Sequence, residues 1–361
     1  MFINDFEYPL RDTNLLNALH ITTTVRGSVP LLSLSITDIS RSFDSLNLQD
    51  GIPIRVVIKP SDLSSRTYLF RKFNHKSVFD GAAYNWTIVG YLDAPVYWNT
   101  TTSKGLRGTS NDVLADIAGN CSLKFDGTTT NDSQLWLPNN STYRGFAKDI
   151  ASCGFVDTTS CMVLAVDLDS TMRYKNVNNL PRPTKNIVAY QQAPGSITAI
   201  DMKLDAASGF NNAVTGYQNM RYAQSSVADD LHTQIDELSF VPDATSPLYN
   251  SKLKKALGRG PVRFGPIDVG NVHDNYEKSS YQNTRYKNLF SMGLELLIPS
   301  LSDIQLLERI NFAVQREDNS PDTVNSGTYT VTGHSLYIEG PKYAEKVGLV
   351  RHGTNERYTE G

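Results

Sequence analysis

The segment 327-GTYTVTGHSLYIEGPKYAEKVGLVRHGTN-355 decides the fold of the C-terminal part of the chain. Its residues alternate with a period of two, which is typical of β-strands. One expected strand face carries Thr330, Thr332, His334, Leu336 and Ile338, and the other carries Tyr329, Val331, Ser335 and Tyr337. Gly340-Pro341 is a turn signal, and a second alternating run follows it. The segment therefore predicts a β-hairpin.

The same segment contains His334 and His352, which raises the question of a catalytic or metal site. A lone strand histidine is more often a packing or surface residue than a ligand, and the chain contains none of the standard zinc, nucleophile-elbow or phosphate-loop motifs. The tidiest acid pair, Asp167 and Asp169, falls at the end of an expected strand and is interpreted as solvated. We expect no enzyme activity, no catalytic residues, no metal and no cofactor.

Composition narrows the class of protein further. The chain has 361 residues, of which 40% are hydrophobic and 20% charged, and its formal net charge is −3. These values indicate a folded protein with no electrostatic attraction to nucleic acids or membranes. The three cysteines, Cys121, Cys153 and Cys161, follow no segment resembling a secretion signal, so free buried thiols are expected.

The N-terminal residues 1–100 show the period-two pattern repeatedly. Ile52, Ile54, Val56 and Ile58 alternate with other residues directly after a turn at Asp50-Gly51. Several short strands at such spacing predict a first small β-barrel over residues 1–100.

Residues 101–180 follow a different plan, a small α/β insert made of two helix-Gly-strand units. Thr109 and Asp112 have the spacing of a capping box, and the helix they begin ends near Gly119. In the second unit, Ser141 or Thr142 is the expected cap, Gly154 the terminator, and Phe155-Val156 the start of a strand. The recurrence is a weak internal repeat.

After Pro181-Arg182-Pro183, β-structure resumes, and a second β-barrel is expected over residues 181–240 and 290–353. An irregular excursion over 241–289 separates its two parts and is expected to include a helix whose spacing runs from Tyr281 to Met292. Its basic segment, 252–263, is either a solvated loop or a contact for an acidic partner. Residues 354–361 form a C-terminal tail. The expected fold is thus mainly β, with two similar small barrels and a two-helix α/β insert.

Three segments carry a family resemblance: 109-TSNDVLADIAGNCSL-123, 142-TYRGFAKDIASCGF-155, and 285-RYKNLFSMGLELLIPSL-301 together with the hairpin. With the order barrel, insert, barrel and closing hairpin, they resemble the baseplate hub proteins of phage tails. That family is related to the base of the type VI secretion spike and to phage late control proteins. The resemblance covers most of the chain, excluding residues 205–280.

The resemblance implies a structural role in a virion, in the baseplate of a tail that is expected to be contractile, after assembly in the host cytoplasm. Hub proteins form homotrimers in which two barrels per chain give a ring of six. Such a ring adapts the six-fold tail tube, or its initiator, to a three-fold central spike. Other baseplate proteins would be further partners. A tape-measure protein or DNA would pass through the channel, and the chain itself would bind no membrane.

Two alternatives stay open, a carbohydrate- or receptor-binding tail module and a cell-wall hydrolase. The first requires rows of exposed aromatic residues on one strand face, whereas the three tryptophans are scattered. The second requires facing acids or a metal triad. For the hub, the candidate interface residues are Leu135, Trp136 and Leu137 between the insert helices, with core packing as the other interpretation, and Arg357 and Tyr358 in the tail.

Overall fold

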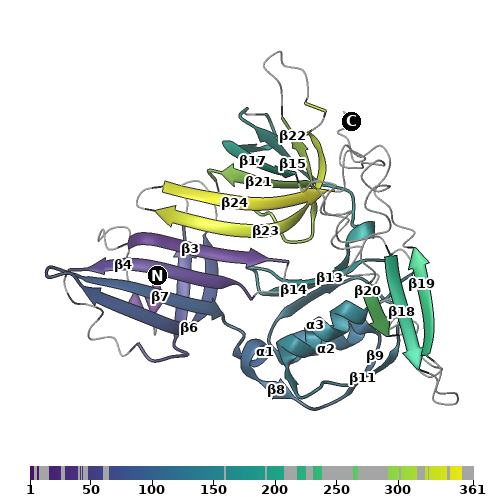
Figure 1. Cartoon of the computed structure of the whole chain (residues 1–361). Coiled ribbons are helices and arrows are strands. Elements are labelled where there is room, and N and C mark those ends of the chain that lie inside the picture. Colours follow the sequence, from purple (N-terminus) through teal and green to yellow (C-terminus); the bar gives the residue numbers. More distant parts are fainter. Residues whose placement is uncertain are drawn as a thin grey trace.

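The computed structural model shows two β-rich lobes beside a smaller helical insert (Figure 1). It describes residues 1–3, 6–7, 16–25, 29–39, 41, 43, 48–59, 65–157, 160–191, 193–206, 218–224, 231–237, 263–266, 292–300, 302–314, 322–323, 325–339 and 342–351. Strands dominate these residues, so the expectation of a mainly β protein with an α/β insert is confirmed.

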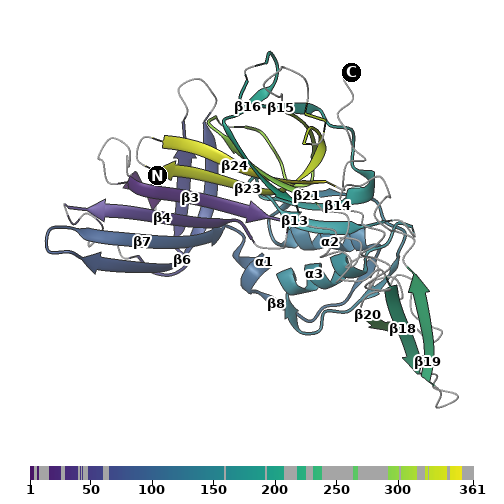
Figure 2. The same ribbon diagram turned by 45° about the horizontal axis from the view of Figure 1, so that its top comes forward.

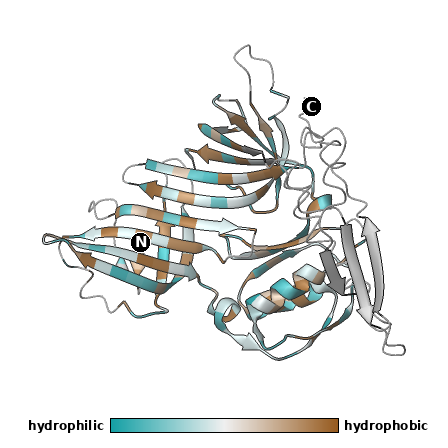
Figure 3. Ribbon diagram, viewed as in Figure 1, coloured by the Kyte–Doolittle hydropathy of each residue, from teal (hydrophilic) through white to brown (hydrophobic). Residues whose placement is uncertain are grey.

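Lobe 1 is the N-terminal part of the sheet. Its strands are β1 (Phe2–Ile3), β2 (Phe6–Glu7), β3 (Leu16–Thr24), β4 (Leu31–Asp38), β5 (Pro53–Ile58), β6 (Arg66–Phe79) and β7 (Tyr84–Leu92). They pair in the order β3-β4-β7-β6-β5-β1-β2. Alternate residues, such as Leu32, Leu34 and Ile36 of β4, point into one core and are fully buried. Figure 3 shows this alternation of hydropathy along the strands.

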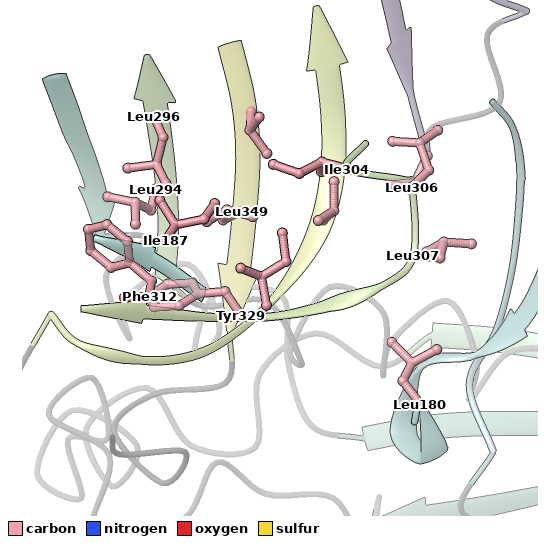
Figure 4. Packing of buried hydrophobic residues seen from close by; sticks show 14 of the residues in the cluster. Leu180, Ile187, Leu294, Leu296, Ile304, Leu306, Leu307, Phe312, Tyr329 and Leu349 are labelled. Carbon is pink, nitrogen blue, oxygen red and sulfur yellow. The ribbon is translucent and has the colours of Figure 1, made fainter. Parts of the chain in front are cut away.

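Lobe 2 combines two distant parts of the chain. Its strands are β15 (Lys185–Ala189), β16 (Ile197–Ala199), β17 (Asp201–Ala206), β21 (Met292–Ile298), β22 (Arg309–Ala313), β23 (Gly327–Glu339) and β24 (Lys342–Arg351). Figure 2 shows how these strands curve around their own core. In that core the Phe312 and Tyr329 rings meet edge to face, with centroids 5.9 Å apart (Figure 4).

The predicted hairpin is present as β23 and β24, and β23 also joins the two lobes. Its first half pairs with β22 of lobe 2, and its second half pairs with β3 of lobe 1. Both lobes therefore belong to one 14-stranded sheet. Neither lobe is a closed ring of paired strands, which corrects the expectation of two barrels. The strand β16 lies at one edge of lobe 2 and β17 at the other edge, and Ile200 connects them. The two strands do not pair with each other, so the ring of strands stays open.

A β-bulge in β23 changes the predicted strand faces. Val331 pairs with Leu349, and the next paired residue, Gly333, lies opposite Gly348, so Thr332 is the extra residue. Before the bulge, Tyr329 and Val331 are buried in the core of lobe 2. After it, the buried residues fall at the even positions His334 and Leu336. Strict alternation over the whole strand was therefore wrong, because the extra residue reverses the side-chain parity.

The insert comprises α1 (Pro95–Asn99), β8 (Thr101–Thr102), β9 (Leu106–Gly108), α2 (Ser110–Asn120), β10 (Lys124–Gly127), β11 (Gln134–Trp136), β12 (Ser141–Thr142), α3 (Tyr143–Cys153), β13 (Met162–Val166), β14 (Thr171–Asn176) and a 3-10 turn (Val177–Asn179). Thr109 and Asp112 form the predicted capping box of α2, and Thr142 caps α3. Phe155 and Val156 lie in irregular backbone, because the next strand begins only at Met162.

Three further strands, within residues 218–224, 231–237 and 263–266, lie apart from the sheet of lobe 2. The strands β18 (Gln218–Gln224), β19 (Leu231–Glu237) and β20 (Arg263–Pro266) pair only with one another among the described strands, in the order β19-β18-β20. The segment up to residue 240 was expected within the second barrel. The helix expected from Tyr281 lies outside the described residues up to position 291, and Met292 begins β21.

Candidate interaction surfaces and the junction between the lobes

Strand β13 lies at the junction between the insert and lobe 2. Its odd-numbered residues Val163 and Ala165 belong to the core of lobe 2, whereas Leu164 and Val166 belong to the core of the insert. Because both faces of β13 are covered, its residues are all buried, although it is the edge strand of the sheet β10-β14-β13. The Thr23 hydroxyl of lobe 1 also donates a 2.8 Å hydrogen bond to the Val166 carbonyl. All three bodies thus meet at β13.

A buried ionic cluster reinforces this junction. The Arg173 guanidinium donates 3.0 Å hydrogen bonds to Asp126, Asp167 and Asp169. The Asp167 Oδ2 also accepts a 2.8 Å bond from the Leu306 amide of lobe 2. Asp167 is only 3% exposed, so the interpretation of this acid pair as a solvated strand end was wrong for Asp167, whereas Asp169 is exposed as expected. Both acids share one arginine and do not face each other across a cleft, so they serve packing.

A second buried cluster lies where the hairpin passes between the lobes. The fully buried Glu345 carboxylate accepts hydrogen bonds from the Ser302 amide at 3.0 Å, from the Ser302 hydroxyl and from the Tyr343 hydroxyl at 2.9 Å. Arg66 of lobe 1 donates to the Ser302 carbonyl. Burial, reinforced by the adjacent Glu345, raises the pKa of Tyr343. The cluster connects β6, the loop before β22, and β24.

His334 lies beside this second cluster. Its side chain is 3% exposed, and its Nε2 atom is 3.4 Å from the Glu345 Oε2 atom. The sequence alone did not show whether His334 is buried or exposed. The bulge at Thr332 sets the side-chain parity that turns His334 toward the protein interior. Across the described residues, no group of three His, Cys, Asp or Glu side chains is arranged to hold a metal ion. His352 lies outside the described residues.

The predicted interface residues 135–137 are divided by strand geometry. Trp136 is 3% exposed, and its indole N–H donates a 3.0 Å hydrogen bond to the Gly108 carbonyl. Leu135 and Leu137 point outward and are 50% and 69% exposed. Because β11 pairs with β9, the tryptophan anchors the end of the strand, and Leu135 in it and Leu137 directly after it are presented to solvent. Arg357 and Tyr358 lie outside the described residues.

A different surface covers the side of the sheet opposite the cores. We call it the hydroxyl face and define it on strands β21, β24, β23, β3, β4 and β7. Its polar residues are Thr22, Ser33, Ser35, Thr37, Thr87 and Ser335, together with His20, Glu295, Tyr337, Glu339, Lys342 and Lys346. The same register places the half-buried Leu31, Val89, Tyr91 and Leu297 on this face. Among the described residues, none of the exposed large hydrophobic side chains lies on these six strands.

Aromatic residues gather on β6, α1 and the end of β7. Phe73 is 49% exposed and contacts Tyr91 edge to face, with centroids 4.9 Å apart and planes at 67°. Tyr91 in turn contacts Trp98, with planes at 47°. A sugar-binding platform usually needs rings that lie flat and accessible. These tilted rings favour side-chain packing over carbohydrate binding.

Burial opposes the activation of two of the free thiols, Cys121 and Cys153. Burial raises the pKa of Cys121 from 9.0 to about 12 and also raises the pKa of Cys153. Because the thiolate is the reactive form, these pKa shifts oppose nucleophilic chemistry. Among the described helices, none combines the length and apolar character needed to span a membrane.

Comparison with known proteins bears on the fold. No protein-family model matches the chain, and no curated protein matches its sequence. Among solved structures, a tail protein from Neisseria meningitidis superimposes over 96% of this chain and 95% of its own, with a TM-score of 0.59 and 9% identity. The 43 kDa tail protein of prophage MuSo2 from Shewanella oneidensis gives 0.58 at 8% identity, over 94% and 95% of the two chains.

A third neighbour is the Escherichia coli c3393 protein, a type VI secretion component described as structurally similar to the T4 tail proteins gp27 and gp5. It gives a TM-score of 0.51 at 7% identity and covers 96% of this chain and 76% of that one. At such identities the likeness shows the fold. The resemblance predicted from the three sequence segments is confirmed at that level: the chain has the fold of phage tail and type VI spike-related proteins.

Proposed function

We propose that the chain is the structural hub of a phage tail baseplate, a trimeric adaptor between the six-fold tail tube and a three-fold central spike. The observation that carries the proposal is the shared fold over nearly the whole length of two tail proteins, one of them from a prophage. The tail would be contractile, the protein would reside in the virion after assembly in the host cytoplasm, and other baseplate proteins would surround it.

The architecture suits such an adaptor. Two lobes in one chain supply six lobes in a trimer, which matches a six-fold ring on one side while the trimer axis matches a three-fold spike on the other. The lobes must then hold a fixed mutual orientation. The antiparallel pairing of β3 with β23 and the buried Arg173 and Glu345 clusters provide that rigidity.

The exposed leucines on either side of Trp136, one in β11 and one directly after it, are the interface that we propose for this hub. Leu135 and Leu137 flank Gly105, where an added Cβ would lie 2.9 Å from the Leu137 side chain, so the surface is tightly built. Two exposed leucines beside a buried tryptophan provide apolar area that an assembled interface would remove from water. Arg357 and Tyr358 in the tail are proposed to contact the spike.

Mass measurement of the purified chain tests the proposal. A trimer that shows six similar lobes at low resolution is the expected result. A stable monomer, particularly one that binds glycans or clears peptidoglycan in a zymogram, would overturn it. Leu135→Ser with Leu137→Ser should shift the trimer toward monomer, and Val96→Ser, at another exposed apolar side chain, is the matched control.

A further inference from the structure

Strand β6 extends past the last residue that its neighbour β5 covers. Pairing with β5 reaches Arg71, which lies opposite Pro53, the first residue of β5. The Gly51 amide then donates a 2.8 Å hydrogen bond to the Lys72 carbonyl, and Gly51 adopts a φ of 84° in the turn there, so the pairing stops at Lys72. The remaining residues, Phe73–Phe79, are all exposed, and Figure 2 shows β6 on the outer side of this arm of lobe 1. We call this segment the β6 edge; among the described strands, only β7 pairs with it.

The ladder with β7 fixes which backbone groups of the β6 edge point outward, because alternate residues of a strand bond to opposite neighbours. The Leu92 amide at the end of β7 donates to the Pro30 carbonyl on the β4 side, so the odd-numbered residues of β7 face β6. The β6 residues opposite those odd positions are Asn74, Lys76 and Val78. The intervening His75 and Ser77 therefore direct their N–H and C=O groups away from β7, where no described residue bonds to them.

Apolar and basic side chains flank the β6 edge. Val78 and Phe79 are 48% and 49% exposed and lie on opposite faces of the strand. Lys76 shares the face of Val78, and Arg41 lies over the other face, with its guanidinium carbon 5.9 Å from the centre of the Phe79 ring. Neither cation forms an ion pair with a residue that the structure describes. The edge thus combines apolar surface with two positive charges that have no acidic partner.

Two acids near the ends of this segment are engaged elsewhere. An Asp50 carboxylate oxygen lies 2.5 Å from the Lys72 ammonium, which holds the pKa of the Asp50 carboxyl below its usual value. Asp80 accepts hydrogen bonds from the Ala82 amide at 3.1 Å and the Ala83 amide at 2.9 Å in the β6–β7 turn. Lys76 and Arg41 therefore remain available to acidic groups of another chain.

We propose that the β6 edge binds an extended, acidic segment of a partner protein, which joins the sheet as an additional strand. Its backbone would pair with His75 and Ser77, and its carboxylates would lie near Lys76 and Arg41. Edge strands that are merely solvated are usually short or blocked by proline or inward-pointing charge. This edge contains no proline and keeps large apolar side chains in water over about 20 Å of strand. The inference goes beyond the proposed hub, since it requires only one folded chain.

A peptide titration tests the proposal. The probe is a short fluorescent peptide of alternating glutamate and valine, followed by fluorescence anisotropy with the full chain at low salt. A peptide with lysine in place of glutamate should bind at least about tenfold more weakly, because Lys76 and Arg41 would repel it. N-methylation of alternate residues, which removes the backbone donors on one side of the peptide, should weaken binding by a similar factor.

A proline in the edge separates strand addition from simple charge attraction. Ser77→Pro removes an outward N–H and leaves the ladder with β7 intact, because that N–H does not face β7. It should weaken binding of the glutamate peptide at least about tenfold, whereas Ser77→Ala, which keeps the N–H, should bind like the wild-type chain. If the proline variant fails to fold, the N-methylated peptide and the wild-type chain give the same comparison.

Charge reversal tests the acidic character of the partner. Lys76→Glu with Arg41→Glu should weaken binding of the glutamate peptide at least about tenfold and favour the lysine peptide. The matched control is Lys104→Glu with Lys148→Glu, which makes the same change in net charge at exposed positions of the insert. This control should leave binding unchanged, and an equal loss in it would mean that total charge and not the β6 edge attracts the peptide.

The outcomes that overturn the inference are specific. Binding that neither Ser77→Pro nor N-methylation reduces would exclude strand addition, and a wild-type chain that binds no glutamate peptide would exclude the acidic partner. If the chain self-associates and only Ser77→Pro, not Ser77→Ala, abolishes the association, the edge belongs to a second copy and the proposal is wrong. The proposed hub is tested separately by mass: a monomer that binds the peptide would overturn the hub and leave this inference standing.

Discussion

The insert and the two-lobed sheet are organised by interactions of different range. In the insert, Thr109 and Asp112 cap the helix that follows them, and Thr142 does the same for α3. In the sheet, the decisive pairing joins β3 near the N-terminus to β23 near the C-terminus, with Thr22 opposite Ser335. Local contacts define one region, and the register of distant strands defines the other.

This difference predicts different responses to mutation. A register error in the sheet moves every following side chain to the wrong face, so a single insertion or deletion affects two cores at once. An error in the insert stays near its position, because each helix end and each close contact involves few neighbours. The predictions below test that contrast, from the largest expected effect to the smallest.

Deletion of Thr332 should have the largest effect. It removes the extra residue of the bulge, so either Tyr329 and Val331 or His334 and Leu336 must turn toward water. Losing buried side chains of this size costs at least about 5 kcal/mol in the free energy of unfolding, which exceeds the margin of many domains. The deletion should abolish soluble expression or the cooperative thermal transition monitored by circular dichroism.

Deletion of Ala82 is the control for that experiment, since this exposed residue lies in the turn between β6 and β7. It should leave a cooperative transition within a few degrees of the wild-type Tm. If both deletions behaved alike, the bulge would have no special role and the contrast between the regions would fail.

Gly154→Ala should give the largest effect within the insert. A Cβ at this position would lie 1.6 Å from the Tyr174 hydroxyl oxygen, a distance that no real contact shows. Tyr174 is fully buried and cannot swing aside, so the strain should cost about 3 kcal/mol or more. Gly119→Ala is the matched control, because nothing lies within 4 Å of its added Cβ and alanine favours a helix by about 1 kcal/mol. Thermal unfolding should therefore move in opposite directions for the two variants.

The parts that were predictable from the sequence follow the same division. The capping box, the helix ends and the hairpin could be found because their signals lie within a few residues. The bulge had one local signal, Gly333 within a strand pattern, since an isolated glycine in a strand suggests such an irregularity. The open sheet shared by both lobes had no local sequence signal, because the pairing of its edge strands is decided by residues far apart in the chain.

The candidate surfaces show the same limit. Trp136 and its two leucine neighbours were identified as a group, but their division into one buried and two exposed side chains follows from the pairing of β11 with β9. The burial of Asp167 was missed because Arg173 and the Leu306 amide approach it only in the folded chain. The hydroxyl face is a property of six strands together and has no motif of its own.

Alkaline pH should lower the stability of both the sheet and the insert, because each buries a tyrosine phenol. The size of the loss in each region tests whether one of them unfolds before the other. Burial raises the pKa of Tyr329 from 10.0 to about 12 and also raises the pKa of Tyr174. The pKa of each phenol is higher in the folded state than in the unfolded state. Each phenol therefore stabilises the folded state fully below pH ~10, and this stabilisation is lost as the pH rises through the folded pKa. For Tyr329 the loss is on the order of 2–3 kcal/mol.

Tyr329→Phe should therefore flatten the fall of Tm between pH 9 and 12, at the cost of the 2.7 Å hydrogen bond to the Asn325 carbonyl. Tyr174→Phe makes the matching test in the insert, where the Ser110 hydroxyl lies 3.1 Å away. Ultraviolet absorbance of tyrosinate, recorded with the melting curves, shows when each phenol ionises. If neither variant changed the dependence of Tm on pH, ionisation of these two tyrosines would not be the cause of the alkaline loss of stability.

Removing one helix cap should give the smallest effect and the most local one. Thr142→Ala deletes the oxygen that accepts a 3.1 Å hydrogen bond from the Gly145 amide, which costs about 1 kcal/mol. Thr142→Ser keeps the oxygen and should restore most of the loss. Hydrogen exchange should show faster opening at the first turn of α3, while the amides of β3 and β23 keep their protection. Faster exchange across the β3–β23 ladder would instead mean that the insert and the sheet unfold as one unit, because a local defect would then have reached the distant register.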